Sequence, residues 1–100
     1  MAGYSSFREF YPFYLGEHRD RTCRRLHFAG TSAALGCIVA AIMHDNAWWF
    51  LGALLCGYAF AWIGHFFFEK NRPATFKHPF YSFIGDWVMY KDMLIGKIKF

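Results

Sequence analysis

The sequence contains little charge for its length, and two long stretches contain no Asp, Glu, Lys or Arg at all. Charged residues make up 18% of the 100 residues, whereas about 25% is usual for a soluble domain. Hydrophobic residues make up 56% and aromatic residues 23%. A water-soluble chain this short could not easily bury so many Phe and Trp side chains. We therefore expect one integral membrane domain that comprises residues 1–100.

Paired cysteines and a cleavable leader are also missing. Cys23, Cys37 and Cys56 form no CxxC pair and no disulfide framework. We expect them to be free thiols that behave as small hydrophobic side chains. Met1–Glu17 lacks the basic-then-aliphatic order of a signal peptide. The first apolar run is therefore expected to act as its own insertion signal.

The two uncharged stretches predict a transmembrane hairpin. Residues 28–43 are fewer than the roughly 20 needed to span the hydrocarbon layer, but extension back to Leu26 makes this segment long enough. Residues 47–68 are long enough alone, and only the turn His44-Asp45-Asn46 separates the two segments. The predicted fold is therefore all-α and membrane-integral, with spans at about 26–43 and 47–68 that form an antiparallel hairpin.

The segments that flank the hairpin are aromatic and partly charged. The N-terminal segment combines Phe and Tyr with Arg, as is typical of the lipid headgroup layer. The segment at about 79–96 contains Asp86, Lys91 and Asp92, which makes it a poor candidate for a span. At helical spacing its apolar residues share one face: Phe80, Phe83, Ile84, Trp87 and Leu94. We expect N- and C-terminal interfacial helices, or a shallow re-entrant segment at the C-terminal end.

The basic residues predict an orientation in the membrane. All eleven Lys and Arg residues precede the first span or follow the second, and the hairpin turn has none. Under the positive-inside rule both termini are then cytoplasmic. We expect the protein to be an integral protein of the bacterial inner membrane.

Four of the five histidines are predicted to gather at one end of the hairpin. His18 and His27 precede or open the first span, His65 closes the second, and His78 follows it. Because the spans are antiparallel, these positions meet at the cytoplasmic face. His44 alone lies at the opposite end.

Small residues indicate where the buried histidines point. Two sets of residues at helical spacing carry them: Ala53, Gly57, Ala61, His65 and Glu69 in the second span, and His27, Thr31, Ala34 and Ala41 in the first. Small residues at this spacing let membrane helices approach closely. His27 and His65 are therefore expected to point into the helix–helix contact, where an ionisable side chain suggests a functional site.

Two interpretations of these histidines remain open at this point. His27 and His65 could bond each other or a backbone carbonyl, or the converging imidazoles, with Glu69 one turn from His65, could hold a metal ion. Imidazole and carboxylate ligands suit non-haem Fe(II), although zinc also accepts them. His18 and His27 are nine residues apart and lie on opposite sides of a continuous helix. They can share an ion only if the chain bends between them.

Two blocks of sequence resemble a known family. Tyr14-Leu-Gly-Glu-His18, followed by Cys23 and His27, resembles a Tyr-x3-His-x4-Asn-x3-His pattern. Residues 64–74, Gly-His-Phe-Phe-Phe-Glu-Lys-Asn-Arg-Pro-Ala, resemble a Gly-His-x3-Glu-x2-Arg-Pro-Ala block. The family is that of the small membrane-bound 2-hydroxy-fatty-acid dioxygenases of phytosphingosine degradation, which form odd-chain fatty acids, with its uncharacterised bacterial relatives. The resemblance covers nearly the whole chain.

The resemblance implies Fe(II)-dependent α-oxidation of a 2-hydroxy fatty acid to the fatty acid one carbon shorter. His18, His27 and His65 would hold the iron. Glu69 would ligate it or orient His65, and Arg72 would bind the substrate carboxylate. Glu69 and Arg72 are the expected catalytic residues. Cys23 stands where the family usually has Asn, and a thiol cannot supply the hydrogen bonds of an amide.

Two other classes of protein compete with this interpretation. A small b-type haem protein would use His27 and His65 as axial ligands, and a non-enzymatic membrane subunit would have structural histidines. The chain contains no His-x2-His-His box of the di-iron desaturases. The expected partners are a 2-hydroxy fatty acid, dioxygen and the lipid bilayer, with a homo-oligomer in addition. Nucleic acid is not an expected partner, because the basic residues follow the membrane border.

Overall fold

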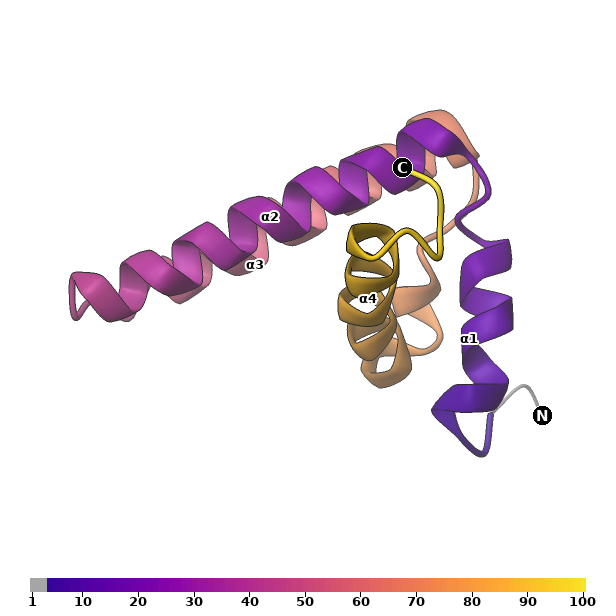
Figure 1. The fold of residues 1–100 in the computed structure, drawn as a ribbon, viewed down its shortest axis with the longest axis horizontal. Coiled ribbons are helices and arrows are strands. Elements are labelled where there is room, and N and C mark those ends of the chain that lie inside the picture. The colour runs from indigo at the N-terminus through magenta and orange to yellow at the C-terminus, as the bar shows by residue number, and fades with distance from the viewer. Residues whose placement is uncertain (1–3) are drawn as a thin grey trace.

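The computed structural model describes residues 4–100, and every regular element in this part of the chain is helical. Figure 1 shows the order of these elements, which are α1 (Phe7–Gly16), α2 (Arg21–Met43), α3 (Trp48–Ile63), the π-helical turn η1 (Gly64–Glu69), the 3-10 turn η2 (Ala74–Phe76) and α4 (Pro79–Leu94). The prediction of an all-α chain is therefore confirmed for the described residues.

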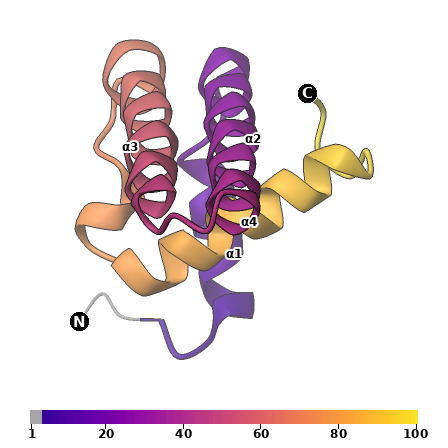
Figure 2. The same cartoon turned by 90° about the vertical axis from the view of Figure 1, so that its left-hand side faces the viewer.

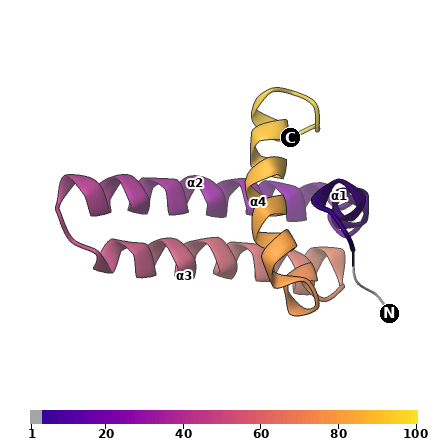
Figure 3. The same ribbon diagram turned by 90° about the horizontal axis from the view of Figure 1, so that it is seen from below.

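Helices α2 and α3 form an antiparallel hairpin and lie side by side along their length (Figure 1, Figure 3). The tight turn between them places Asp45 at a φ of 48°, and Asn46 Oδ1 accepts a hydrogen bond from the N–H of Trp48 at 3.0 Å. Two helical segments, Arg21–Met43 and Trp48–Glu69, are long and apolar enough to cross a membrane. The hairpin has the predicted form, while its insertion into a bilayer stays a prediction.

Small residues line the contact between α2 and α3. The buried residues of the two helices include Thr31, Ala34, Ala41, Ala53 and Ala61, so the inner faces predicted from the sequence are confirmed. Gly30 marks the closest approach, because a Cβ added there would lie 2.8 Å from Phe60 Cβ. Only a glycine fits at such a crossing without displacing the partner helix.

The outer surfaces of the same two helices carry large apolar side chains. They include Leu35, Val39, Ile42, Trp48, Leu51, Leu55 and Ile63, and Phe66 and Phe67 of the following turn η1 continue this surface. A contiguous apolar surface of this extent is rare on a monomer in water and is typical of a protein or membrane contact. The aromatic run Phe66-Phe67-Phe68, which follows α3, is exposed throughout.

Helices α1 and α4 pack together beside one end of the hairpin (Figure 1, Figure 2). Their shared core contains Phe10, Tyr14, Met89 and Met93, all buried. Polar contacts add to this packing, since Tyr11 Oη donates to Asp92 Oδ2 at 2.7 Å.

Helix α4 also crosses the hairpin, as Figure 3 shows from below. Ser32 Oγ of α2 and Tyr90 Oη of α4 lie 2.9 Å apart and share a hydrogen bond. The predicted apolar face of α4 is partly outward, because Phe80, Phe83 and Leu94 are exposed. Its buried side contacts the rest of the protein, so the location of α4 at a membrane interface stays a prediction.

Candidate metal centre

The chain bends between α1 and α2, which is the condition that the spacing of His18 and His27 demanded. Helix α1 ends at Gly16 and α2 begins at Arg21. Asp20 caps α2 by accepting a hydrogen bond from the N–H of Cys23 at 3.0 Å. Because residues 17–20 are not helical, the two histidines are free to approach each other.

The carboxylate of Glu69 holds this bend. Its Oε1 accepts the N–H of Arg19 at 3.1 Å, and its Oε2 accepts the N–H of Asp20 at 2.6 Å. Backbone N–H groups at the start of a helix have no partner within the helix, and an anion there is favourable. Glu69 thus ties the end of η1 to the start of α2.

His65 lies in the π-helical turn η1 at the end of α3. Such turns are rare and are frequent at functional sites. The turn ends at Lys70 in the left-handed conformation, at a φ of 61°, and the N–H of Asn71 bonds the carbonyl of His65 at 3.0 Å.

Cys23 packs against the start of the same turn. A Cβ added to Gly64 would lie 3.0 Å from Cys23 Sγ and 3.1 Å from Cys23 Cα. Cys23 is fully buried. At the position where the Tyr-x3-His-x4-Asn-x3-His pattern has Asn, this chain therefore has a small packing residue rather than a hydrogen-bonding one.

Three imidazoles meet at the junction of α1, α2 and η1. The Nε2 atoms of His18 and His27 lie 3.1 Å apart, those of His27 and His65 3.2 Å, and those of His65 and His18 2.9 Å. All three side chains are buried, with 2%, 6% and 1% of their surface exposed. They form the group of potential metal ligands in the described residues.

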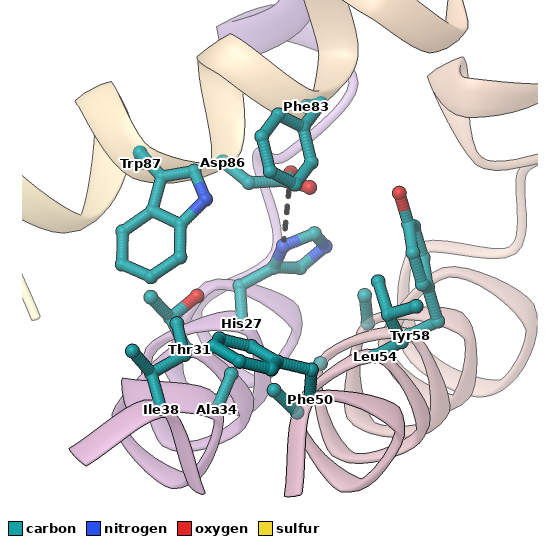
Figure 4. Close-up of a pocket in the computed structure, with 13 residues that line it drawn as sticks. His27, Thr31, Ala34, Ile38, Phe50, Leu54, Tyr58, Phe83, Asp86 and Trp87 are labelled. Atoms are coloured by element: carbon teal, nitrogen blue, oxygen red, sulfur yellow. Dashed lines mark ion pairs between the residues drawn. The ribbon is translucent and has the colours of Figure 1, made fainter. Parts of the chain in front are cut away.

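Each imidazole has a separate polar neighbour at its other nitrogen. His18 Nδ1 donates to the carbonyl of Tyr14 at 2.7 Å, and His65 Nδ1 donates to Asn71 Oδ1 at 2.7 Å. His27 Nδ1 faces Asp86 Oδ1 at 3.7 Å, the contact drawn as a dashed line in Figure 4. A proton on each Nδ1 leaves each Nε2 as an acceptor.

The donor set suits a metal ion. Three acceptor lone pairs that point at one another cannot form hydrogen bonds among themselves, whereas a cation satisfies all three. Nitrogen atoms bonded to one ion at about 2.0–2.1 Å and roughly at right angles lie about 3 Å apart, which is the separation of these Nε2 atoms. Burial and the neighbouring His65 lower the pKa of His18 to about 3. The imidazole therefore stays neutral and able to ligate at physiological pH.

Asp86 is a site residue that the sequence interpretation missed. It was noted only as a charge that argues against a third span, yet α4 places it beside His27. Tyr14 Oη donates a short hydrogen bond to Asp86 Oδ1. Burial raises the pKa of the Asp86 carboxyl to about 7, and the Tyr14 hydrogen bond opposes this rise. The signal that could have found it is an acidic residue within an otherwise apolar helix.

Gly85 lets Tyr14 reach Asp86. A Cβ added at Gly85 would lie 2.9 Å from the Tyr14 ring, so the ring lies directly on the backbone of α4. The same ring stacks on His18, with ring centroids 4.1 Å apart. Tyr14 thus contacts two of the site's residues, with its backbone carbonyl bonded to His18 and its hydroxyl to Asp86.

The structure does not bring every predicted site residue to the imidazoles. Glu69 binds the backbone of the bend, as described above. Arg72 is exposed and lines two other pockets rather than the cavities lined by His18, His27 and His65. His78 contacts the rings of Phe10 and Phe13. The neighbour of Arg72, Asn71, is the residue that reaches His65.

Two connected cavities adjoin the imidazoles. The smaller, about 10 Å³, is lined by all three histidines and has room for about one water molecule or ion. The larger, about 300 Å³, is an apolar groove between α2 and α3 beneath α4 (Figure 4). His27, Tyr58, Ala61 and Asp86 line both. The groove therefore begins at the imidazoles.

The geometry does not favour haem. Axial ligands lie on opposite faces of the macrocycle. The Nε2 atoms of His27 and His65 are only 3.2 Å apart, and His18 Nε2 lies about equally close to both. These nitrogen atoms are too close together for the plane of a porphyrin to lie between His27 and His65.

The fold and the histidine cluster together define the class of protein. This is a small all-helical chain with two candidate membrane-spanning helices and a buried three-histidine cluster that could bind a metal ion. The chain belongs to the Mpo1-like family, whose model has the description 2-hydroxy-palmitic acid dioxygenase Mpo1-like and matches residues 4–98. No curated protein and no solved structure matches the chain. The resemblance inferred from the two motif blocks is thereby confirmed at the level of the family.

Proposed function

We propose that this protein is a membrane-bound, Fe(II)-dependent dioxygenase that converts a 2-hydroxy fatty acid to the fatty acid one carbon shorter. The observation that carries the proposal is the convergence of three Nε2 acceptors within 3.2 Å of one another. The family description names a 2-hydroxy-palmitic acid dioxygenase, and the apolar groove beside the histidines suits a fatty acyl chain.

His18, His27 and His65 would hold the iron. A three-imidazole site leaves ligand positions open, as non-haem Fe(II) oxygenases require, and bound Fe(II) would supply the chemistry with dioxygen. The residues around the imidazoles orient them. Asn71 holds His65, and Asp86 lies against His27. Such partners fix the tautomer and the ring direction of ligating histidines.

The groove would take the acyl chain. Its lining runs along α2 from His27 to Ile38, eleven residues that rise about 16 Å at 1.5 Å per residue. This length is about half of the ~30 Å hydrocarbon layer, which is the depth that the acyl chains of one leaflet fill. An amphiphile in that leaflet would therefore place its polar head beside the imidazoles and its tail in the groove.

The reaction balances with one molecule of dioxygen. A 2-hydroxy acid and O2 give the acid shorter by one carbon, carbon dioxide and water, so the bond between C1 and C2 breaks. Burial of the imidazoles excludes bulk water from the reacting carbons, which limits side reactions. The substrate reaches this buried point through the groove and so need not leave the membrane.

The test is a product assay on purified full-length protein. Loaded with Fe(II) without oxygen and then mixed with oxygen and 2-hydroxypalmitate, the protein should release a fifteen-carbon acid. Protein loaded with Zn²⁺ should release none, because zinc has no redox chemistry. Palmitate should react poorly, since it lacks the 2-hydroxyl. Chain shortening that continues with a chelator present, or equally with palmitate, would contradict the proposal.

The proposal includes an orientation with both termini in the cytoplasm. It is supported by eleven Lys and Arg residues outside the hairpin turn and none within it. A reporter fused after Phe100 should behave as cytoplasmic, and one inserted at Asp45 as external. Labelling of the C-terminus from outside the cell would overturn this orientation and leave the chemistry of the site unaffected.

A further inference from the structure

One buried hydroxyl group near the imidazoles has no partner. Ser82 Oγ is 1% exposed and forms no hydrogen bond within the described residues. A serine in a helix often bonds the carbonyl one turn back, yet Ser82 does not. A buried polar group without a partner is unfavourable and is expected where a ligand will supply one.

Ser82 lines the small cavity beside the three histidines. Two further hydroxyl-bearing residues, Tyr58 and Thr75, line it as well. No Lys or Arg does, and Arg72 lies at other depressions of the surface. The small cavity thus brings hydroxyl groups, which can donate hydrogen bonds, together with imidazoles.

The small cavity is the polar end of the apolar groove. Tyr58 and Asp86 line both, together with His27. In Figure 4, Tyr58 extends from α3 and Asp86 from α4, which lies over the groove. A ligand whose tail occupies the groove therefore brings its head to the mouth of the small cavity, where one carboxylate oxygen, about the size of a water molecule, can enter toward Ser82.

We propose that Ser82, together with Tyr58 and Thr75, binds the carboxylate of the fatty acid through neutral hydroxyl donors. This inference rests on the proposed function and names how the same site recognises its substrate. A carboxylate only accepts hydrogen bonds, and a hydroxyl donates one. Hydrogen bonds to a charged group are stronger than neutral ones, so three hydroxyls can replace the arginine that the sequence suggested for this role.

The experiment measures equilibrium binding without oxygen, on the full-length iron-loaded protein in lipid nanodiscs. For Ser82→Ala, the affinity for 2-hydroxypalmitate and for palmitate should fall about 10- to 100-fold. The affinity for hexadecane-1,2-diol, which keeps the hydroxyl and lacks the carboxylate, should not change. Bound iron and Tm should match those of the wild type, because the substitution removes no hydrogen bond of the free protein.

Ser32→Ala is the matched control. Ser32 connects α2 to α4 through a hydrogen bond with Tyr90, and it lines neither cavity. This variant should lower Tm and leave all three affinities as they are. The pair thus separates loss of a ligand contact from loss of a structural contact.

Each other outcome has a defined meaning. Unchanged binding of both acids by Ser82→Ala would overturn the inference, and an equal loss for the diol would show that Ser82 contacts the hydroxyl instead of the carboxylate. Wild-type protein that binds the acids but releases no shorter acid would contradict the proposed function alone. Wild-type protein that binds neither acid would overturn the carboxylate site itself.

Discussion

The two ends of the α2–α3 hairpin are held together by different interactions. At the end near the turn, Ile42, Met43 and Trp48 are exposed, and small residues provide the contact between the helices. At the other end, α1 and α4 cover the hairpin (Figure 1), and hydrogen bonds join side chains from four elements. The apolar end presents a surface that suits a protein or lipid contact, whereas the covered end supplies its own buried polar surroundings. Only the covered end can therefore keep three imidazoles dry and oriented.

The largest difference between the two ends should appear in metal binding. His27→Ala removes one of three Nε2 ligands at the covered end, and we expect bound iron to fall at least tenfold. His44→Ala changes a histidine at the turn end that stacks on Trp49, and bound iron should stay at the wild-type level. Iron measured per mole of purified protein checks both variants. Equal amounts of bound iron in His27→Ala and wild type would contradict the proposed metal centre.

Replacing Asp86 should give the second-largest effect, a loss of metal affinity. Asp86→Asn keeps the shape of the side chain but removes the negative charge 3.7 Å from His27 Nδ1. Partners of ligating histidines typically contribute 10- to 100-fold to metal affinity, and we expect a loss in this range. Competition with a chelator of known affinity measures it. Asp45→Asn, at the turn end, is the control and should bind iron as the wild type does.

Hairpin packing can be tested with two glycines of α2. A Cβ at Gly30 would lie 2.8 Å from Phe60 Cβ, so Gly30→Ala should destabilise the protein by about 1–3 kcal/mol. Gly36 has nothing within 4 Å of an added Cβ, and Gly36→Ala should leave stability unchanged or raise it by about 0.5–1 kcal/mol. Unfolding in detergent with increasing SDS compares the two. Similar stability of both variants would show that α2 and α3 do not pack as described.

The smallest effect concerns pH and the metal-free protein. The folded-state pKa of His18, about 3, lies below its ordinary value of 6.5. Its contribution to stability is present above pH 6.5 and is lost as pH falls toward 3. The folded-state pKa of Asp86, about 7, lies above its ordinary 3.8, so its contribution grows as pH falls over the same interval. The two contributions change in opposite directions, so protonation of Asp86 should offset part of the loss of wild-type stability between pH 6.5 and 5.5.

The same Asp86→Asn variant separates these contributions. Without Asp86 this offset is absent, and between pH 6.5 and 5.5 the variant should lose about 1 kcal/mol more stability than the wild type. Chelator-treated protein unfolded at pH 6.5 and at 5.5 gives the comparison. An equal change in wild type and variant would indicate that Asp86 does not titrate in this interval.

The sequence by itself determined the hairpin and most of the histidine cluster at its end. Uncharged stretches of sufficient length indicate helices, and the small-residue spacing around Ala34 and Ala61 assigned their inner faces. Position alone gathered four histidines at one end, His18, His27, His65 and His78, because an antiparallel hairpin joins the start of one span to the end of the next. The family resemblance then singled out the first three. These features depend on local periodicity, which a sequence records directly.

Only the tertiary structure decided which residues surround the imidazoles. Asp86 comes from α4 and Tyr14 from α1, and their contact depends on how two flanking helices pack through Gly85. Glu69 and Arg72 lie in the same motif block as His65. The π-helical turn and the left-handed Lys70 nevertheless direct these two side chains away from the imidazoles and place Asn71 beside His65. Side-chain direction after such a turn follows from backbone angles and long-range packing, which residue spacing along the chain does not specify.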